Sequence, residues 1–159
     1  MSFYSTLESI ANKHPDRLAI VTPSKSITYF GLFMAVEDAC NELFMTKHKT
    51  NFLTVYENGN PERFVAQMIA AFRMGFRVLP MPPSVNVINR QRIAYDISNY
   101  KQEIPDEGDL LHFTSGTYGS QKLVVRSHAN LENEAMGVVD HLRLNDSFVQ
   151  VKNGYSFRI

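Results

Sequence analysis

Amphipathic segments with helical spacing alternate along this chain with short apolar runs that are typical of strands. The predicted helices cover residues 3 to about 15, 29 to about 45, 61 to about 75 and about 129 to 142. The predicted strands are residues 18–21, 26–29, 52–56, 76–81, 110–113, 123–125 and 148–151. We expect Thr28 to cap the second helix, Pro61 to begin the third, Gly75 to end it, and Ser127 to cap the last.

The order of these elements predicts the fold class. Strands separated by helices of this length imply βαβ units, so we expect an α/β fold with a mainly parallel sheet flanked by helices. A length of 159 residues and a hydrophobic content of 44% suffice for one core, which predicts a single domain over residues 1–159. Ligands of such sheets bind beyond the carboxyl ends of the strands. The loop that follows the strand at 110–113 should therefore lie at a binding edge.

That loop is part of residues 113–126, FTSGTYGSQKLVVR, which combine glycines, hydroxyl side chains and a lysine between two apolar runs. Gly116 and Gly119 permit positive φ and a close approach of a bulky ligand, so that backbone N–H groups can turn inward around an anion. Hydroxyl donors surround them, and Lys122 adds a compact positive charge. The segment therefore predicts a phosphate-binding loop at the hairpin-like tip of a sheet.

Two simpler interpretations of this loop stay open. Turns rich in Ser, Gly and Thr are common between strands and often bind nothing, in which case Lys122 is a solvated surface lysine. The spacing also departs from the G-x-x-x-x-G-K-[ST] pattern of P-loop NTPases, because the glycines are closer together and Leu123 follows the lysine. An ordinary P-loop NTPase is therefore disfavoured.

Residues 114–122, TSGTYGSQK, with Ser127-His128 and Asn130-Leu131 behind them, resemble the signature TSGTTGxPK…SHxNL of the adenylate-forming (AMP-binding) superfamily. This superfamily includes acyl-CoA synthetases, adenylation domains of nonribosomal peptide synthetases, and luciferases. Residues 27–32, ITYFGL, and residues 68–83, MIAAFRMGFRVLPMPP, resemble two other core blocks of the family in the same order. The resemblance implies an incomplete N-terminal part of the large domain of these enzymes.

The resemblance also implies a chemistry and its participants. In this superfamily a carboxylate attacks the α-phosphate of ATP, giving an acyl-adenylate and pyrophosphate, and a thiol of CoA or of a carrier protein then takes the acyl group. It implies ATP and Mg²⁺ as cofactors, a carboxylic acid as substrate and a CoA or carrier-protein thiol as acceptor. The residues it assigns to the ATP phosphates are Thr114, Ser115, Gly116, Thr117, Tyr118, Gly119 and Lys122.

Several positions depart from the family pattern. Tyr118 stands where a small Thr or Ser is usual, Gln121 replaces a proline, and Leu123 stands where glycine is usual. A helix is expected over residues 89–100, but the strand that ordinarily follows it is not evident. The adenine-binding segment, the acidic residue near Mg²⁺, the ribose-binding aspartate and the C-terminal domain with its catalytic lysine have no counterpart here. No catalytic residue is therefore assigned, and we do not expect this chain alone to complete adenylation.

Composition narrows the partners. The chain has 16 basic and 16 acidic residues without a long run of either sign, so neither nucleic acid nor an anionic membrane is an expected partner. Charged residues interrupt the apolar stretches and the N-terminus has no signal-peptide pattern, so we expect no transmembrane helix. The single Cys40 is expected to be a buried structural thiol with no positive group beside it, and the histidines show no metal-ligand spacing. The expected compartment is the cytoplasm.

Three functional hypotheses follow. The first is the N-terminal portion of an ATP-dependent adenylate-forming ligase, present as a truncated product or as one piece of a split enzyme that needs a complementary chain. The second is a non-catalytic binding or assembly module that keeps the core fold and has lost the chemistry. The third is a small phosphate-binding enzyme of unrelated fold. The acyl substrate cannot be inferred from these residues.

Overall fold

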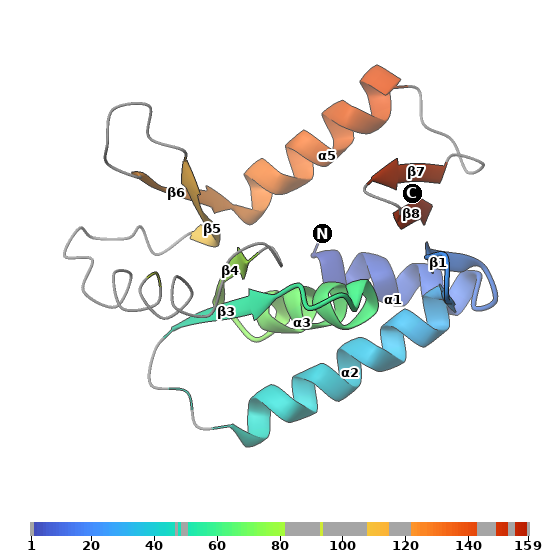
Figure 1. The fold of residues 1–159 in the computed structure, drawn as a ribbon, viewed down its shortest axis with the longest axis horizontal. Coiled ribbons are helices and arrows are strands. Elements are labelled where there is room, and N and C mark those ends of the chain that lie inside the picture. Colours follow the sequence, from blue (N-terminus) through green and yellow to red (C-terminus); the bar gives the residue numbers. More distant parts are fainter. Residues whose placement is uncertain are drawn as a thin grey trace.

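The computed structural model of the chain describes residues 2–46, 48, 51–81, 93, 108–114, 122–142, 149–152 and 155–158. Helices and strands alternate along these residues (Figure 1). The helices are α1 (Phe3–Lys13), α2 (Tyr29–Met45), α3 (Pro61–Arg73) and α5 (His128–Leu142). The strands are β1 (Leu18–Val21), β2 (Ser26–Thr28), β3 (Phe52–Tyr56), β4 (Arg77–Met81), β5 (Gly108–Thr114), β6 (Lys122–Ser127), β7 (Val149–Lys152) and β8 (Tyr155–Arg158). The helix expected over 89–100 lies outside the described residues, Ile93 excepted.

The described strands form two four-stranded sheets. In the sheet β3-β4-β5-β6 the first three strands are parallel and β6 runs antiparallel to β5, which confirms a mostly parallel sheet flanked by helices. The sheet β2-β1-β8-β7 is antiparallel throughout. The turn between β1 and β2 is too short for a parallel crossover, so these two strands must pair in the antiparallel sense. The sequence pattern does not predict the rest of this second sheet, because alternation along short strands does not reveal distant partners.

Local chemistry explains where the helices begin and end. Thr28 Oγ1 accepts a hydrogen bond from the backbone N–H of Gly31 at 3.1 Å, which confirms Thr28 as the cap of α2. Asn60 caps α3 through its side chain, and Pro61 is the first residue of that helix, as predicted. Gly75 follows α3 with φ of 78°, a left-handed conformation that favours glycine and turns the chain into β4.

Strand β4 is the centre of the main sheet, paired with β3 on one side and with β5 on the other. Its Val78 packs with Ala71 of α3 on one face of the sheet. Its Leu79 packs with Leu111 of β5 on the other face, and these four side chains are all at least 99% buried. A parallel strand buried on both faces is the expected centre of an α/β sheet.

Helices α1, α2 and α3 pack against one another around a shared apolar cluster (Figure 1). Leu7 of α1, Val36 of α2 and Ala70 of α3 are buried in this cluster. Small side chains on α3 let α2 lie close to it. Among the described residues, no helix combines the length and the apolar character that crossing a membrane requires.

A polar cluster, which we call the Arg73 cluster, ties these three helices together. The Arg73 guanidinium of α3 lies 3.8 Å above the ring of Tyr4 from α1 and donates to Oε1 of Glu37 on α2 at 2.5 Å. The Tyr4 hydroxyl donates to the same carboxylate oxygen at 2.7 Å. One carboxylate thus receives two donors from two other helices, which fixes the relative positions of all three.

Cys40 lies at the edge of this cluster and corrects one expectation. Its Sγ is 3.8 Å from a guanidinium nitrogen of Arg73, so the expectation that no positive group lies beside Cys40 is wrong. Burial nevertheless raises the pKa of the thiol, and the nearby arginine only partly opposes this effect. A half-buried thiol with a raised pKa is a poor nucleophile, in agreement with a structural role.

Arg73→Met should destabilise the chain more than Arg63→Met, a matched change at the other end of the same helix. The Arg73→Met variant lacks a charge-assisted hydrogen bond and a cation–π contact, so we expect its free energy of unfolding to fall by about 1 to 2 kcal/mol. The exposed pair between Arg63 and Glu42, at 3.3 Å, should contribute less than about 0.5 kcal/mol. Urea unfolding of both variants measures the difference, and equal losses would contradict a special role for Arg73.

Tyr4 makes stability depend on alkaline pH. Burial and its hydrogen bond to Glu37 raise the pKa of Tyr4 from the ordinary 10.0 to about 12. The folded chain therefore holds this proton more tightly than the unfolded chain, so its stabilisation is complete below pH 10 and is lost as pH rises towards 12. Tyr4→Phe should show a shallower fall in the free energy of unfolding over that interval. Urea unfolding at several pH values measures this for both proteins. If the free energy of unfolding falls equally steeply in both, Tyr4 is not the source of the pH dependence.

Candidate functional site

The two ends of the predicted phosphate loop lie directly opposite each other on adjacent strands. β5 and β6 form an antiparallel ladder in which Phe113 is the partner of Leu123 and Thr114 is the partner of Lys122. This confirms the expected hairpin. The other assigned residues, Ser115, Gly116, Thr117, Tyr118 and Gly119, lie outside the described residues, as does Gln121. The structure therefore fixes the base of the loop.

This hairpin base lies at the carboxyl edge of the parallel strands. β3 ends at Tyr56, β4 at Met81 and β5 at Thr114, and the parallel pairing of these strands brings their ends to the same edge of the sheet. Ligands of open α/β sheets bind beyond this edge. The segment that resembles a phosphate loop thus begins where the fold class expects a ligand.

The base of the hairpin packs against the apolar core of the sheet. Leu123 and Val125 of β6 pack against the cluster formed by Leu79, Met81 and Leu111. Leu123 is the residue that stands where the family has glycine, and the structure gives it a packing role beneath the loop. A firmly packed base restricts the directions in which the loop can extend from the sheet.

Side-chain hydrogen bonds join β6 to helix α5. The backbone N–H of Asn130 donates to Ser127 Oγ at 3.2 Å, and Ser127 Oγ donates to Asn130 Oδ1 at 2.9 Å. Ser127 therefore caps α5 as predicted, although the helix begins at His128, one residue earlier than expected. An ion pair between Arg126 and Glu134 spans the same junction.

His128 connects this junction to the helical layer. Its ring lies 4.4 Å from the ring of Phe3 on α1 and 6.3 Å from that of Phe72 on α3, measured between centroids. Its Nε2 is 3.3 Å from Oε1 of Glu132, one turn along α5. In the sequence, His128 is evident only as part of the Ser127-His128 motif. No local pattern indicates its contacts with Phe3 and Phe72, which are distant in sequence.

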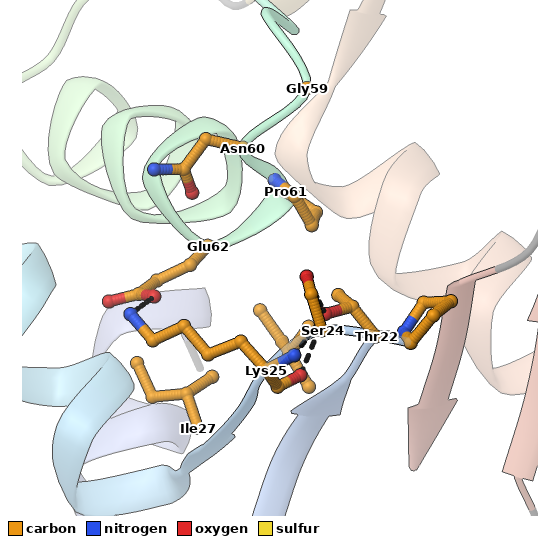
Figure 2. A pocket seen from close by; sticks show the side chains of 10 residues that line it. Thr22, Ser24, Lys25, Ile27, Gly59, Asn60, Pro61 and Glu62 are labelled. Atoms are coloured by element: carbon orange, nitrogen blue, oxygen red, sulfur yellow. Dashed lines mark hydrogen bonds and ion pairs between the residues drawn. The ribbon is translucent and has the colours of Figure 1, made fainter.

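A cavity of about 460 Å³ opens between the β1–β2 turn and the start of α3 (Figure 2). Ile20 and Ile27 supply apolar walls. The side chains of Lys25 and Glu62 point toward each other and form an ion pair at the cavity (Figure 2). Thr22 Oγ1 accepts from the backbone N–H of Lys25 at 2.9 Å and donates to its carbonyl oxygen at 2.7 Å. These polar groups are bonded to one another. They stabilise the turn that lines the cavity and are not directed at a ligand.

A second cavity, of about 400 Å³, lies between β3 and α3. Thr54, Tyr56, Asn58, Arg63 and Gln67 contribute to its lining, which is mainly polar. Its place beside the carboxyl end of β3 puts it on the binding edge of the sheet. Among the described residues no three His, Cys, Asp or Glu side chains group as metal ligands.

Comparison with known sequences gives no match to a protein-family model or to a curated protein. Comparison with solved structures gives several. Over 92% of this chain, o-succinylbenzoate coenzyme A synthetase from Bacillus subtilis, in complex with ATP and magnesium ion, superposes with a TM-score of 0.72 and 15% identity. The chain covers 48% of that structure, so it spans about half the length of this relative in fold.

Two other structures of this kind match equally well. The nonribosomal peptide synthetase FmoA3, bound to alpha-methyl-L-serine-AMP, gives a TM-score of 0.73 with 15% identity over 92% of this chain and 20% of its own. A fatty acyl-adenylate ligase from L. pneumophila, bound to acyl adenylate and pyrophosphate, gives 0.70 with 16% identity over 91% of this chain and 33% of its own. An unrelated fold, the third hypothesis, is therefore excluded. The chain has the fold of the N-terminal portion of the adenylate-forming ligases.

Proposed function

We propose that this chain is the N-terminal segment of an ATP-dependent carboxylate-activating ligase and binds the ATP phosphates through residues 114–122. One observation carries the proposal. Thr114 and Lys122, which bound the TSGTYGSQK segment, are cross-strand partners at the carboxyl edge of the parallel sheet. A phosphate loop needs this placement, because its backbone amides must face a ligand held beyond the ends of the strands.

The composition of the loop suits the β- and γ-phosphates. Gly116 and Gly119 allow the backbone to approach closely, and the hydroxyl groups of Thr114, Ser115 and Thr117 can donate hydrogen bonds to phosphate oxygens. Lys122 supplies a positive charge, and Mg²⁺ carried by the nucleotide neutralises the remainder. Together these groups stabilise pyrophosphate as it leaves when a carboxylate attacks the α-phosphate. A CoA or carrier-protein thiol is the proposed acceptor of the acyl group.

Helix α5 supports a complementary portion of polypeptide as a partner. From Asn133 to Val138 every described side chain is exposed, including Met136 at 59% and Val138 at 45%. A helix of this length is marginally stable in water without a packed face. We propose that the rest of the adenylating domain, in the same chain or a second one, covers α5. The proposed compartment is the cytoplasm, where the lone Cys40 stays reduced.

The alternative is a non-catalytic binding or assembly module, which the departures at Tyr118 and Gln121 favour. A phenol ring in place of a small hydroxyl side chain reduces the space above the phosphates, and loss of the usual proline removes a restraint on the loop. Such a module would keep the hairpin and its packed base and would bind nucleotide weakly or not at all. Nucleotide affinity therefore separates the two functions.

Lys122→Ala should weaken binding of Mg·ATP to the full chain about tenfold, because it removes a charge-assisted contact to phosphate. Isothermal titration calorimetry measures the affinity, with Mg·pyrophosphate as a second ligand that lacks the nucleoside. Lys13→Ala, at the end of α1, is the matched control and should bind like the parent. If the parent binds neither ligand while remaining folded, the binding-loop assignment fails and the non-catalytic module is preferred.

Supplying the other segments of such a ligase should allow the complete reaction. A polypeptide with the adenine-binding and C-terminal segments of a related ligase, supplied in trans, should give carboxylate-dependent exchange between ATP and pyrophosphate. Lys122→Ala should reduce that exchange at least tenfold, since the same contact stabilises the departing pyrophosphate. A folded complex that exchanges nothing with a broad panel of carboxylates would rule out a split enzyme.

A further inference from the structure

Three aromatic rings from distant parts of the chain meet beside the start of α5. They belong to Phe3 of α1, Phe72 of α3 and His128, and we call them the ring cluster. The ring centroid of Phe3 lies 5.9 Å from that of Phe72 and 4.4 Å from that of His128. The rings of Phe72 and His128 are 6.3 Å apart at an interplanar angle of 90°. Each ring thus contacts both of the others at the separations that aromatic pairs prefer.

The ring cluster joins the end of β6 to the helical layer. Phe72 also packs against the buried core around Val78, which lies on the helical side of the sheet. His128 directly follows β6, whose Leu123 and Val125 pack on the opposite side of the sheet. The segment from β6 into α5 is therefore held from both sides of the sheet, by two aliphatic residues on one side and by an imidazole ring on the other.

The ring of His128, rather than the pairing of its Nε2, makes this connection. Nε2 is 3.3 Å from Oε1 of Glu132, which lies one turn further along the same helix. A contact within one helix stabilises that helix and does not attach it to another element. The ring contacts, in contrast, reach two other helices. An aromatic side chain without the nitrogen should therefore preserve the connection.

β6 requires an anchor at this end because its pairing is irregular there. Among the described strands it pairs only with β5. The register between them shifts between Gly108 and Leu110, beside Ser127, whereas it is regular towards the pair Thr114 and Lys122. A register shift interrupts the ladder locally, and apolar packing alone is not directional. The ring cluster thus acts at the end of β6 where backbone hydrogen bonding defines its position least.

We propose that His128 is a positioning residue for the phosphate loop. Through the ring cluster it holds β6 in the orientation that places Lys122, at the other end of the strand, where the loop binds the ATP phosphates. This inference rests on the proposed function. The two residues are about 20 Å apart along the strand, so His128 acts through β6 and does not contact the nucleotide. Without the cluster, β6 adopts other orientations, and the apparent affinity falls with the fraction of molecules that remain competent to bind.

Isothermal titration calorimetry of the full chain with Mg·ATP tests the role of the ring. His128→Ala should raise Kd about two- to tenfold, the range that corresponds to one aromatic contact. His128→Phe should bind like the parent, because it retains a ring and lacks only the nitrogens. His141→Ala alters an exposed histidine in the last turn of the same helix and is the matched control, which should also bind like the parent.

A double-mutant cycle with Phe3→Ala distinguishes the ring cluster from a general loss of stability. Phe3→Ala should weaken binding by a similar factor, and the double variant with His128→Ala should bind no more weakly than either single variant. His128→Leu fills the site without an aromatic ring and replaces His128→Ala if that variant does not fold. Losses that simply add, or a His128→Phe variant that binds as weakly as the variant without a ring, overturn the proposal.

Hydrogen exchange measures the strand itself without nucleotide. His128→Ala should raise the exchange rates of backbone amides in β6 several-fold and leave those of β3 unchanged. Unchanged exchange in β6, or unchanged affinity of this variant when the parent binds Mg·ATP, overturns the positioning role and leaves the proposed function standing. A folded parent that binds neither Mg·ATP nor Mg·pyrophosphate overturns both, because there is then no phosphate for the loop to hold.

Discussion

The burial of strand β4 on both faces is the constraint on which the rest of this structure depends. Its backbone pairs with β3 and β5, while Val78 and Leu79, neighbours in sequence, anchor the two apolar layers on opposite sides of the sheet. The helical layer packs on the Val78 side. Leu111 and Leu123, which support the hairpin, pack on the other. The position of the loop base relative to the helices is thus set through a single strand.

Much of this fold could be predicted from local patterns. The caps at Thr28 and Ser127 and the proline at the start of α3 give helix starts within about one residue of those observed, whereas α3 ends two residues before the predicted Gly75. The pairing of β1 with β8 could not be predicted, because short alternating runs do not specify distant partners. The Arg73 cluster could not be predicted either, because it joins three helices through side chains that follow no periodic pattern.

The candidate site could be predicted in part, because its hairpin depends on local sequence whereas the support around it depends on tertiary packing. Glycines and hydroxyl residues between two apolar runs predict a loop on a hairpin, and the ladder that ends at Thr114 and Lys122 confirms the hairpin. What the pattern cannot supply is the support around it. His128 rests against Phe3 and Phe72, residues from two other helices, and only the folded chain brings them together. Local sequence thus predicts the hairpin that carries the proposed loop, whereas tertiary packing determines how firmly its base is held.

The pairing of β1 with β8 has a consequence for the order of folding. Ile20 pairs with Phe157, so the hairpin of β1 and β2 completes its sheet with a strand that is synthesised long after it. Until then β1 presents an unpaired edge, and closing so long a loop is entropically slow. During synthesis this edge is free to recruit a strand from another nascent chain. The hairpin of β1 and β2 is therefore exposed to misassembly until β8 has been synthesised.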